Sequence, residues 1–112
     1  MDSLKPVTPD YVVIDEESAK ILYALGNRMT KLERIALRKW RIAIMIYGID
    51  ARLAYCDDDG LNKQLLDNLD IGMVVVSVQD NGITAARSLG DDSFRLVRVD
   101  NNGRFVTTED TN

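Results

Sequence analysis

The sequence predicts an α+β protein in which N-terminal helices pack on a C-terminal antiparallel β-meander. Two observations lead to this prediction. Between residues 16 and 47, apolar residues recur at the three- and four-residue spacing of amphipathic helices. Between residues 73 and 108, short runs rich in valine and other strand-forming residues alternate with turns of Asp, Asn and Gly. We expect one domain over residues 1–112, with an extended lead-in at 1–9 and a frayed end at 109–112.

The first helix is expected over about residues 16–27. Three consecutive acidic residues at 15–17 suit the positive N-terminal end of a helix dipole. Gly26 and Asn27 follow the last apolar residues of this segment, and they either end the helix or kink it.

The second helix is expected over residues 31–47. Thr30 and Glu33 have the spacing of a capping box, in which each side chain accepts a hydrogen bond from the other residue's backbone N–H. Gly48 is a suitable stop. The apolar arc of this helix consists of Leu32, Ile35, Ala36, Trp40, Ala43, Ile46 and Tyr47.

Two short helices are expected to complete the N-terminal part, at residues 51–56 and 61–69. An uninterrupted helix over 16–56, paired with another as a coiled coil, is the competing interpretation. Lys39 and Asp50 interrupt its heptad pattern, so a packed helical hairpin is preferred.

The C-terminal part is expected to form three to four antiparallel strands over about residues 73–108. Asn81-Gly82 is the strongest hairpin signal, because both residues accept a positive φ. Ala85 and Ala86 weaken the strand expected at 83–89, and a helix remains an alternative there.

Several classes of function lack their usual residues. The chain has no histidine and a single cysteine, Cys56, so it offers neither the commonest general base nor a disulfide. Asp57–Asp59 before Gly60 lack the acidic residue that an EF-hand needs at its last position, where Leu66 stands. No glycine-rich phosphate loop is present. We therefore expect no catalytic residues, no metal and no cofactor.

The N-terminus does not have the pattern of a signal peptide, and no apolar run reaches the length of about 18 residues that a membrane span needs. We therefore expect a cytoplasmic protein without a membrane partner. The formal net charge of −4 argues against general binding to nucleic acids.

Positive charge is nevertheless concentrated between Arg28 and Arg41, which contain six bases and one acid. Four of these bases fall on the side of the second helix that lies opposite the apolar arc: Lys31, Arg34, Arg38 and Arg41. They form either a solvated helix face or a binding surface for phosphates or an acidic protein.

The C-terminal half of this helix is apolar on more than one side, because Ile42, Ile44 and Met45 lie on its flanks and back. A homodimer would explain this excess, with Trp40, Ile42, Met45 and Ile46 at the interface. Trp40 also lies on the apolar arc, where a tryptophan is more often a core residue than an exposed anchor.

By elimination, the sequence predicts a small binding protein that acts stoichiometrically on a protein partner. Inhibitors, adaptors and accessory proteins of viruses or mobile elements have this character. A nucleic-acid-binding regulator that uses the basic helix 28–41 is the alternative, and it requires bases that no acid neutralises. A structural subunit of a larger assembly is the third possibility.

Overall fold

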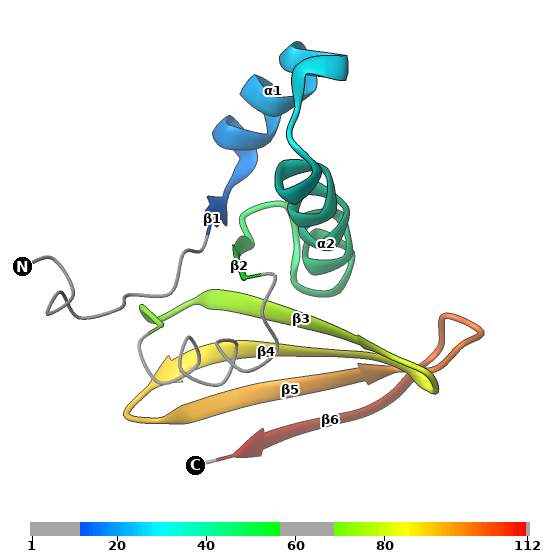
Figure 1. Ribbon diagram of the computed structural model, residues 1–112. Helices are drawn as coiled ribbons and strands as arrows, with labels where there is room; N and C mark the ends of the chain where they lie inside the picture. Colours follow the sequence, from blue (N-terminus) through cyan, green and yellow to red (C-terminus); the bar gives the residue numbers. More distant parts are fainter. Residues whose placement is uncertain (1–11, 57–68, 112) are drawn as a thin grey trace, which may run out of the picture.

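The computed structural model describes residues 12–56 and 69–111. The elements in chain order are β1 (Val12–Ile14), α1 (Glu16–Leu25), the 3₁₀ turn η2 (Gly26–Arg28), α2 (Lys31–Tyr47), β2 (Arg52–Tyr55), β3 (Met73–Gln79), β4 (Gly82–Gly90), β5 (Ser93–Val99) and β6 (Phe105–Thr111). The six strands form one sheet in the order β1-β2-β3-β4-β5-β6 (Figure 1). The α+β class is therefore confirmed.

The sheet is larger than predicted, and it is mixed. Strands β3 to β6 form the expected antiparallel meander of four strands. Strand β2 runs parallel to β3, and β1 runs antiparallel to β2, so two further strands extend the meander on one side. Residues 83–89 lie within β4, which decides between strand and helix at this segment.

The short helix predicted at 51–56 is wrong, because residues 52–55 form the strand β2. Leu53 pairs with Ile14 of β1 on one side and with Val74 of β3 on the other, and none of its surface is exposed. A central strand that is buried on both faces reads as a short apolar run, which periodicity alone does not distinguish from a buried helix. The helix predicted at 61–69 falls, except for Leu69, outside the described residues, and so does the lead-in at 1–9.

The two main helices begin where their capping residues predict. The Asp15 carboxylate accepts a hydrogen bond from the backbone N–H of Ser18 at 2.8 Å, which lowers the pKa of this carboxyl below its ordinary value. The capping box of α2 is complete, with Thr30 and Glu33 bonded reciprocally at 3.1 and 2.8 Å. Helix α1 ends at Leu25, two residues earlier than predicted.

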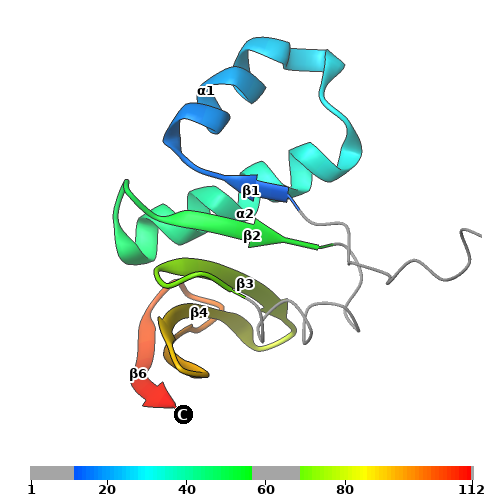
Figure 2. The ribbon, with the colours of Figure 1, turned by 90° about the vertical axis from the view of Figure 1, so that its left-hand side faces the viewer.

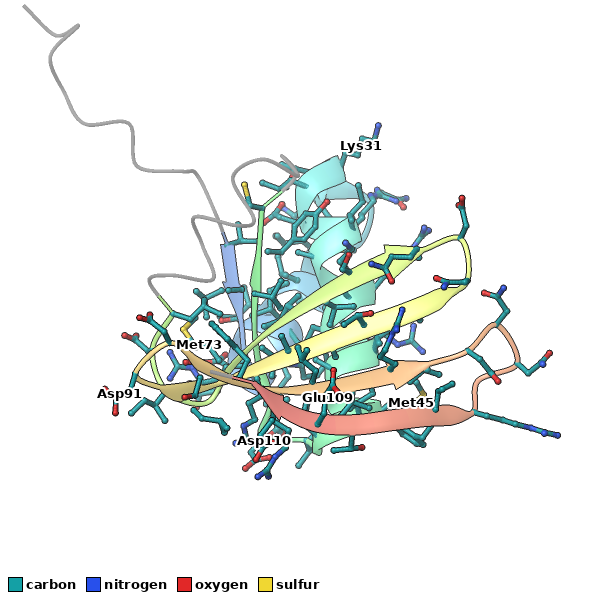
Figure 3. All side chains as sticks on the ribbon, turned by 90° about the horizontal axis from the view of Figure 1, so that it is seen from below. Lys31, Met45, Met73, Asp91, Glu109 and Asp110 are labelled. Atoms are coloured by element: carbon teal, nitrogen blue, oxygen red, sulfur yellow. The ribbon has the colours of Figure 1, made fainter. Side chains whose placement is uncertain are left out.

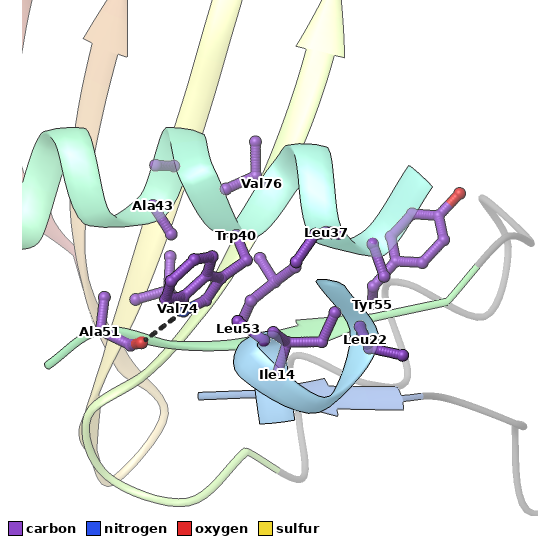
Figure 4. Close-up of a cluster of buried hydrophobic side chains, with 13 residues drawn as sticks. Ile14, Leu22, Leu37, Trp40, Ala43, Ala51, Leu53, Tyr55, Val74 and Val76 are labelled. Atoms are coloured by element: carbon purple, nitrogen blue, oxygen red, sulfur yellow. Dashed lines mark hydrogen bonds between the residues drawn. The ribbon is translucent and has the colours of Figure 1, made fainter. Parts of the chain in front are cut away.

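The main core lies between α2 and the strands β1 to β3 (Figures 2 and 4). Trp40 is at its centre, and the indole N–H donates to the carbonyl oxygen of Ala51 at 3.1 Å. A second, smaller cluster contains Ala54, Cys56, Met73 and Val75, which alternate with the core-facing residues of β2 and β3.

The C-terminal end of the sheet is ordered further than predicted. Strand β6 continues to Thr111 and pairs with β5 along its length, so residues 109–111 are not frayed. The ion pair between Arg95 and Asp110, at 2.9 Å, joins the two strands in this segment. At the other end of these strands, the Asn101 side chain donates to the carbonyl oxygen of Asp80 at 3.1 Å. This hydrogen bond links the turn between β5 and β6 to the turn between β3 and β4.

Candidate functional site

The outward face of α2 carries a line of exposed side chains, which we call the α2 stripe and which consists of Lys31, Arg34, Arg38, Arg41 and Met45. The residues are spaced three and four apart, so they lie above one another on one side of the helix. Lys31 and Met45 mark the two ends of the stripe in Figure 3. The four predicted binding bases are therefore brought together on one exposed surface.

The opposite side of α2 is fixed to the sheet by polar contacts as well as by the core. The Lys39 ammonium donates to the carbonyl oxygen of Val76 at 3.3 Å and lies 4.8 Å from the centre of the Tyr55 ring. The Tyr47 hydroxyl lies 3.1 Å from the carbonyl oxygen of Ala85 and 2.9 Å from that of Arg95. Burial raises the pKa of this hydroxyl, so it remains a donor at neutral pH. These contacts hold α2 in a fixed position on the sheet, and the stripe on its other side is positioned with it.

The positive charge of the stripe is not neutralised within residues 12–56 and 69–111. Arg34 donates to the backbone carbonyl oxygen of Asn27 at 3.2 Å, a neutral acceptor that orients the side chain without neutralising its charge. Lys31, Arg38 and Arg41 make no ion pair with any acid of the described segments. No acid of the described segments therefore competes with another molecule for the bases of the stripe.

An apolar surface continues the stripe at the C-terminal end of α2. Met45 has 62% of its surface exposed, and an open hollow beside it is lined by Arg41, Ile44 and Ile49. Met45 also borders a second hollow, whose lining includes the exposed Val78 of β3. Arg41 and Met45 thus line the same hollow, so a positive charge and an apolar side chain lie next to each other there.

The homodimer interface predicted on α2 does not fit the position of its residues. Trp40 is 5% exposed and belongs to the core of this chain, so it is not accessible to a second one. Ile42 and Ile46 are half-buried and pack against the same core. Of the four predicted residues only Met45 is exposed. Apart from Met45, the excess of apolar residues on α2 is explained by burial against the core of the same chain.

The described residues contain no group of three or more Cys, Asp or Glu side chains placed to hold a metal ion. The triple aspartate 57–59 lies outside them. Cys56 is buried. In the same part of the chain, no helix has the length and hydropathy needed to cross a membrane.

Sequence reasoning missed Ile49 and Val78 as parts of this surface. Ile49 comes after the helix stop at Gly48, so helical spacing does not extend to it, and only the turn after α2 brings it beside Met45. Val78 comes from β3, and only the packing of α2 on the sheet brings it close to Met45.

Comparisons with known proteins give no further guidance: no protein-family model, no curated protein and no solved structure matches this chain.

Proposed function

We propose that the protein acts by stoichiometric binding to a protein partner, as an inhibitor, adaptor or accessory protein, and that the outward face of α2 is the binding surface. The observation that carries this proposal is the continuation of the basic stripe into exposed apolar side chains. Four bases are followed on the same side by Met45 and then by Ile49.

This composition is typical of interfaces between proteins. Arginine and methionine are both enriched at such interfaces, where an apolar centre is surrounded by a polar rim. From Lys31 to Arg41 the stripe extends about 15 Å along the helix, at a rise of about 1.5 Å per residue. The partner that fits it has an acidic surface of similar length, with an apolar side chain at the end that meets Met45. Arginine suits such a partner, because its guanidinium binds carboxylates in a bidentate manner.

Nucleic-acid binding is the second candidate, and one observation favours it. The bases of the stripe are exposed, and Lys31, Arg38 and Arg41 have no acidic partner in the described segments. Four phosphate contacts would give a salt dependence of about −3.6 in log K against log salt, which means weak binding at physiological salt. Met45 and Ile49 would have no counterpart on a phosphate backbone. The protein partner is therefore preferred.

The test is the double variant Arg38→Glu/Arg41→Glu. We choose this pair because neither side chain makes a hydrogen bond or ion pair with the described part of the chain, whereas Arg34 is bonded to Asn27. Proteins retained by the wild-type protein are quantified by mass spectrometry, and the binding of each purified candidate is measured by calorimetry. We expect a one-to-one complex whose Kd rises about thirtyfold or more in the double variant, as for two interface residues that each contribute about 1 kcal/mol.

The matched control is Arg98→Glu/Arg104→Glu, which makes the same change of charge at exposed positions on β5 and just before β6, outside α2. It should keep the partner at wild-type affinity. Both double variants should retain the circular dichroism spectrum and melting temperature of the wild type. If the stripe variant keeps its protein partner and instead loses tight binding to a DNA duplex or an RNA strand at physiological salt, the nucleic-acid function is correct.

A further inference from the structure

We propose that β6 is a pairing edge for a second copy of this chain, so that two sheets join through antiparallel β6 strands. Among the described residues, strand β6 is at the end of the sheet and pairs only with β5 (Figure 1). Its outer side therefore carries backbone N–H and C=O groups that another strand can bind.

The two edges of the sheet differ in how open they are to pairing. The other edge, β1, has three residues, and a very short strand is a common protection against pairing. Strand β6 has seven residues and contains neither lysine nor proline, the residues that usually block an edge. Phe105 is 60% exposed and Val106 is 59% exposed, so the strand begins with two large apolar side chains in solvent.

The remaining protective features of β6 are weak. A bulge interrupts its register with β5 near Phe105, but pairing is continuous from residue 107 to residue 111. The Asp110 carboxylate is bound by the Arg95 guanidinium at 2.9 and 3.4 Å, which neutralises one of the two acids. The other acid of this strand, Glu109, forms no ion pair with a base of the described segments.

The sequence of β6 favours one register with its own copy. Two identical antiparallel strands are related by a two-fold axis that passes through one residue position. An axis at Thr108 lies within the regular part of the strand, and it places Glu109 opposite residue 107 and Asp110 opposite Val106, beside the bulge. No carboxylate then lies directly opposite another. An axis at Glu109 would place this carboxylate opposite its own copy, which is unfavourable.

The size of this contact predicts a weak dimer. A pair of seven-residue strands buries far less than the roughly 1,200–2,000 Å² of a stable interface. The monomer and dimer should therefore exchange, with the dimer growing as the concentration rises. Most of α2 packs on β1 to β3, and it reaches β4 and β5 through the Tyr47 hydroxyl, so pairing at the outer side of β6 should leave the α2 stripe free.

The test uses charge at Thr108, which is exposed and lies at the predicted axis. The variants Thr108→Glu and Thr108→Lys each place two like charges opposite one another. We expect each to weaken self-association about fivefold, as for a like-charged pair directly opposite on neighbouring strands. An equimolar mixture of the two variants should dimerise again, because opposite charges then meet. Sedimentation equilibrium over micromolar to millimolar concentrations measures all three samples and the wild type.

The matched control is Ser77→Glu, an exposed strand position on β3 that is away from β6. It should associate like the wild type, and circular dichroism should show that every variant is folded. A wild-type protein that stays at 12.6 kDa up to millimolar concentration would overturn the proposal. So would Thr108 variants that dimerise as well as the wild type, or a mixture that fails to recover, since the contact would then lie elsewhere or in another register.

Discussion

Replacing Trp40 by alanine tests whether α2 is held by the core of this chain or by a second one. In the structure the indole is 5% exposed, packs among the residues between α2 and the strands β1 to β3, and donates a hydrogen bond to Ala51. The variant therefore removes a large buried side chain and leaves a buried carbonyl oxygen without its partner. Figure 4 shows the ring enclosed by side chains from both layers.

The cost of this change is large relative to the stability of so small a protein. Truncating a buried tryptophan to alanine lowers the free energy of unfolding by about 3–5 kcal/mol. A chain of 112 residues has a total stability of about 6–17 kcal/mol. At about 4 °C per kcal/mol, the melting temperature should fall by about 12–20 °C.

The assay is thermal and urea unfolding of Trp40→Ala beside Met45→Ala, which lies on the same helix but is mostly exposed. The Met45 variant should change the free energy of unfolding by less than about 0.5 kcal/mol, as surface substitutions do. Both should be measured at several protein concentrations. The reasoning is refuted if Trp40→Ala melts like the wild type, or if its loss of stability depends on protein concentration, because Trp40 would then be buried by a second chain.

Two further predictions concern single backbone and capping positions. Gly82 has a φ of +141°, and a Cβ at this position would overlap the carbonyl oxygen of Val99, whereas Gly103, at +80°, has open space around it. Gly82→Ala should therefore lower the free energy of unfolding by about 3 kcal/mol or more, and Gly103→Ala by only about 1–2 kcal/mol. Urea titrations measure both values, and equal losses in the two variants would contradict the predicted overlap at Gly82. Asp15→Ala should cost about 1 kcal/mol at pH 7, the typical value of an N-cap. The pKa of Asp15 is lowered in the folded state, so this contribution to stability is complete above the ordinary pKa of 3.8 and is lost as the pH falls through the lower folded value. The wild type and the Asp15 variant should therefore unfold alike near the acid end of a pH series. A difference in stability that persists there would contradict the capping role.

The parts of the fold that the sequence predicts well are those decided by local chemistry. Both ends of α2 are correct, because a capping box at Thr30 and a glycine at position 48 act within one turn of the helix. The meander is correct for a similar reason, since its hairpin turns carry residues that accept unusual backbone angles. These signals involve residues close to one another in the chain.

The errors concern features that depend on distant segments. Strand β2 owes its conformation to pairing with β1 and β3, and no pattern within its four residues shows those neighbours. The end of β6 looked frayed because it is polar, but pairing with β5 and the ion pair from Arg95 to Asp110 hold it in the sheet. Periodicity placed Trp40 on the buried side of α2, and it could not say whether the same chain or another one covers it.

The structure separates the residues that hold α2 in place from those that it offers to a partner. Trp40, Lys39 and Tyr47 fix the helix to the sheet from one side, while the stripe lies on the other and makes no ion pair with the described segments. Charge reversal in the stripe should therefore change binding with little effect on stability, and truncation of Trp40 should change stability first. For this reason, a loss of binding by the folded Arg38→Glu/Arg41→Glu variant can be attributed to the surface itself. The charge at Thr108, on a strand that α2 does not cover, should in turn alter self-association and leave the binding of the partner unchanged.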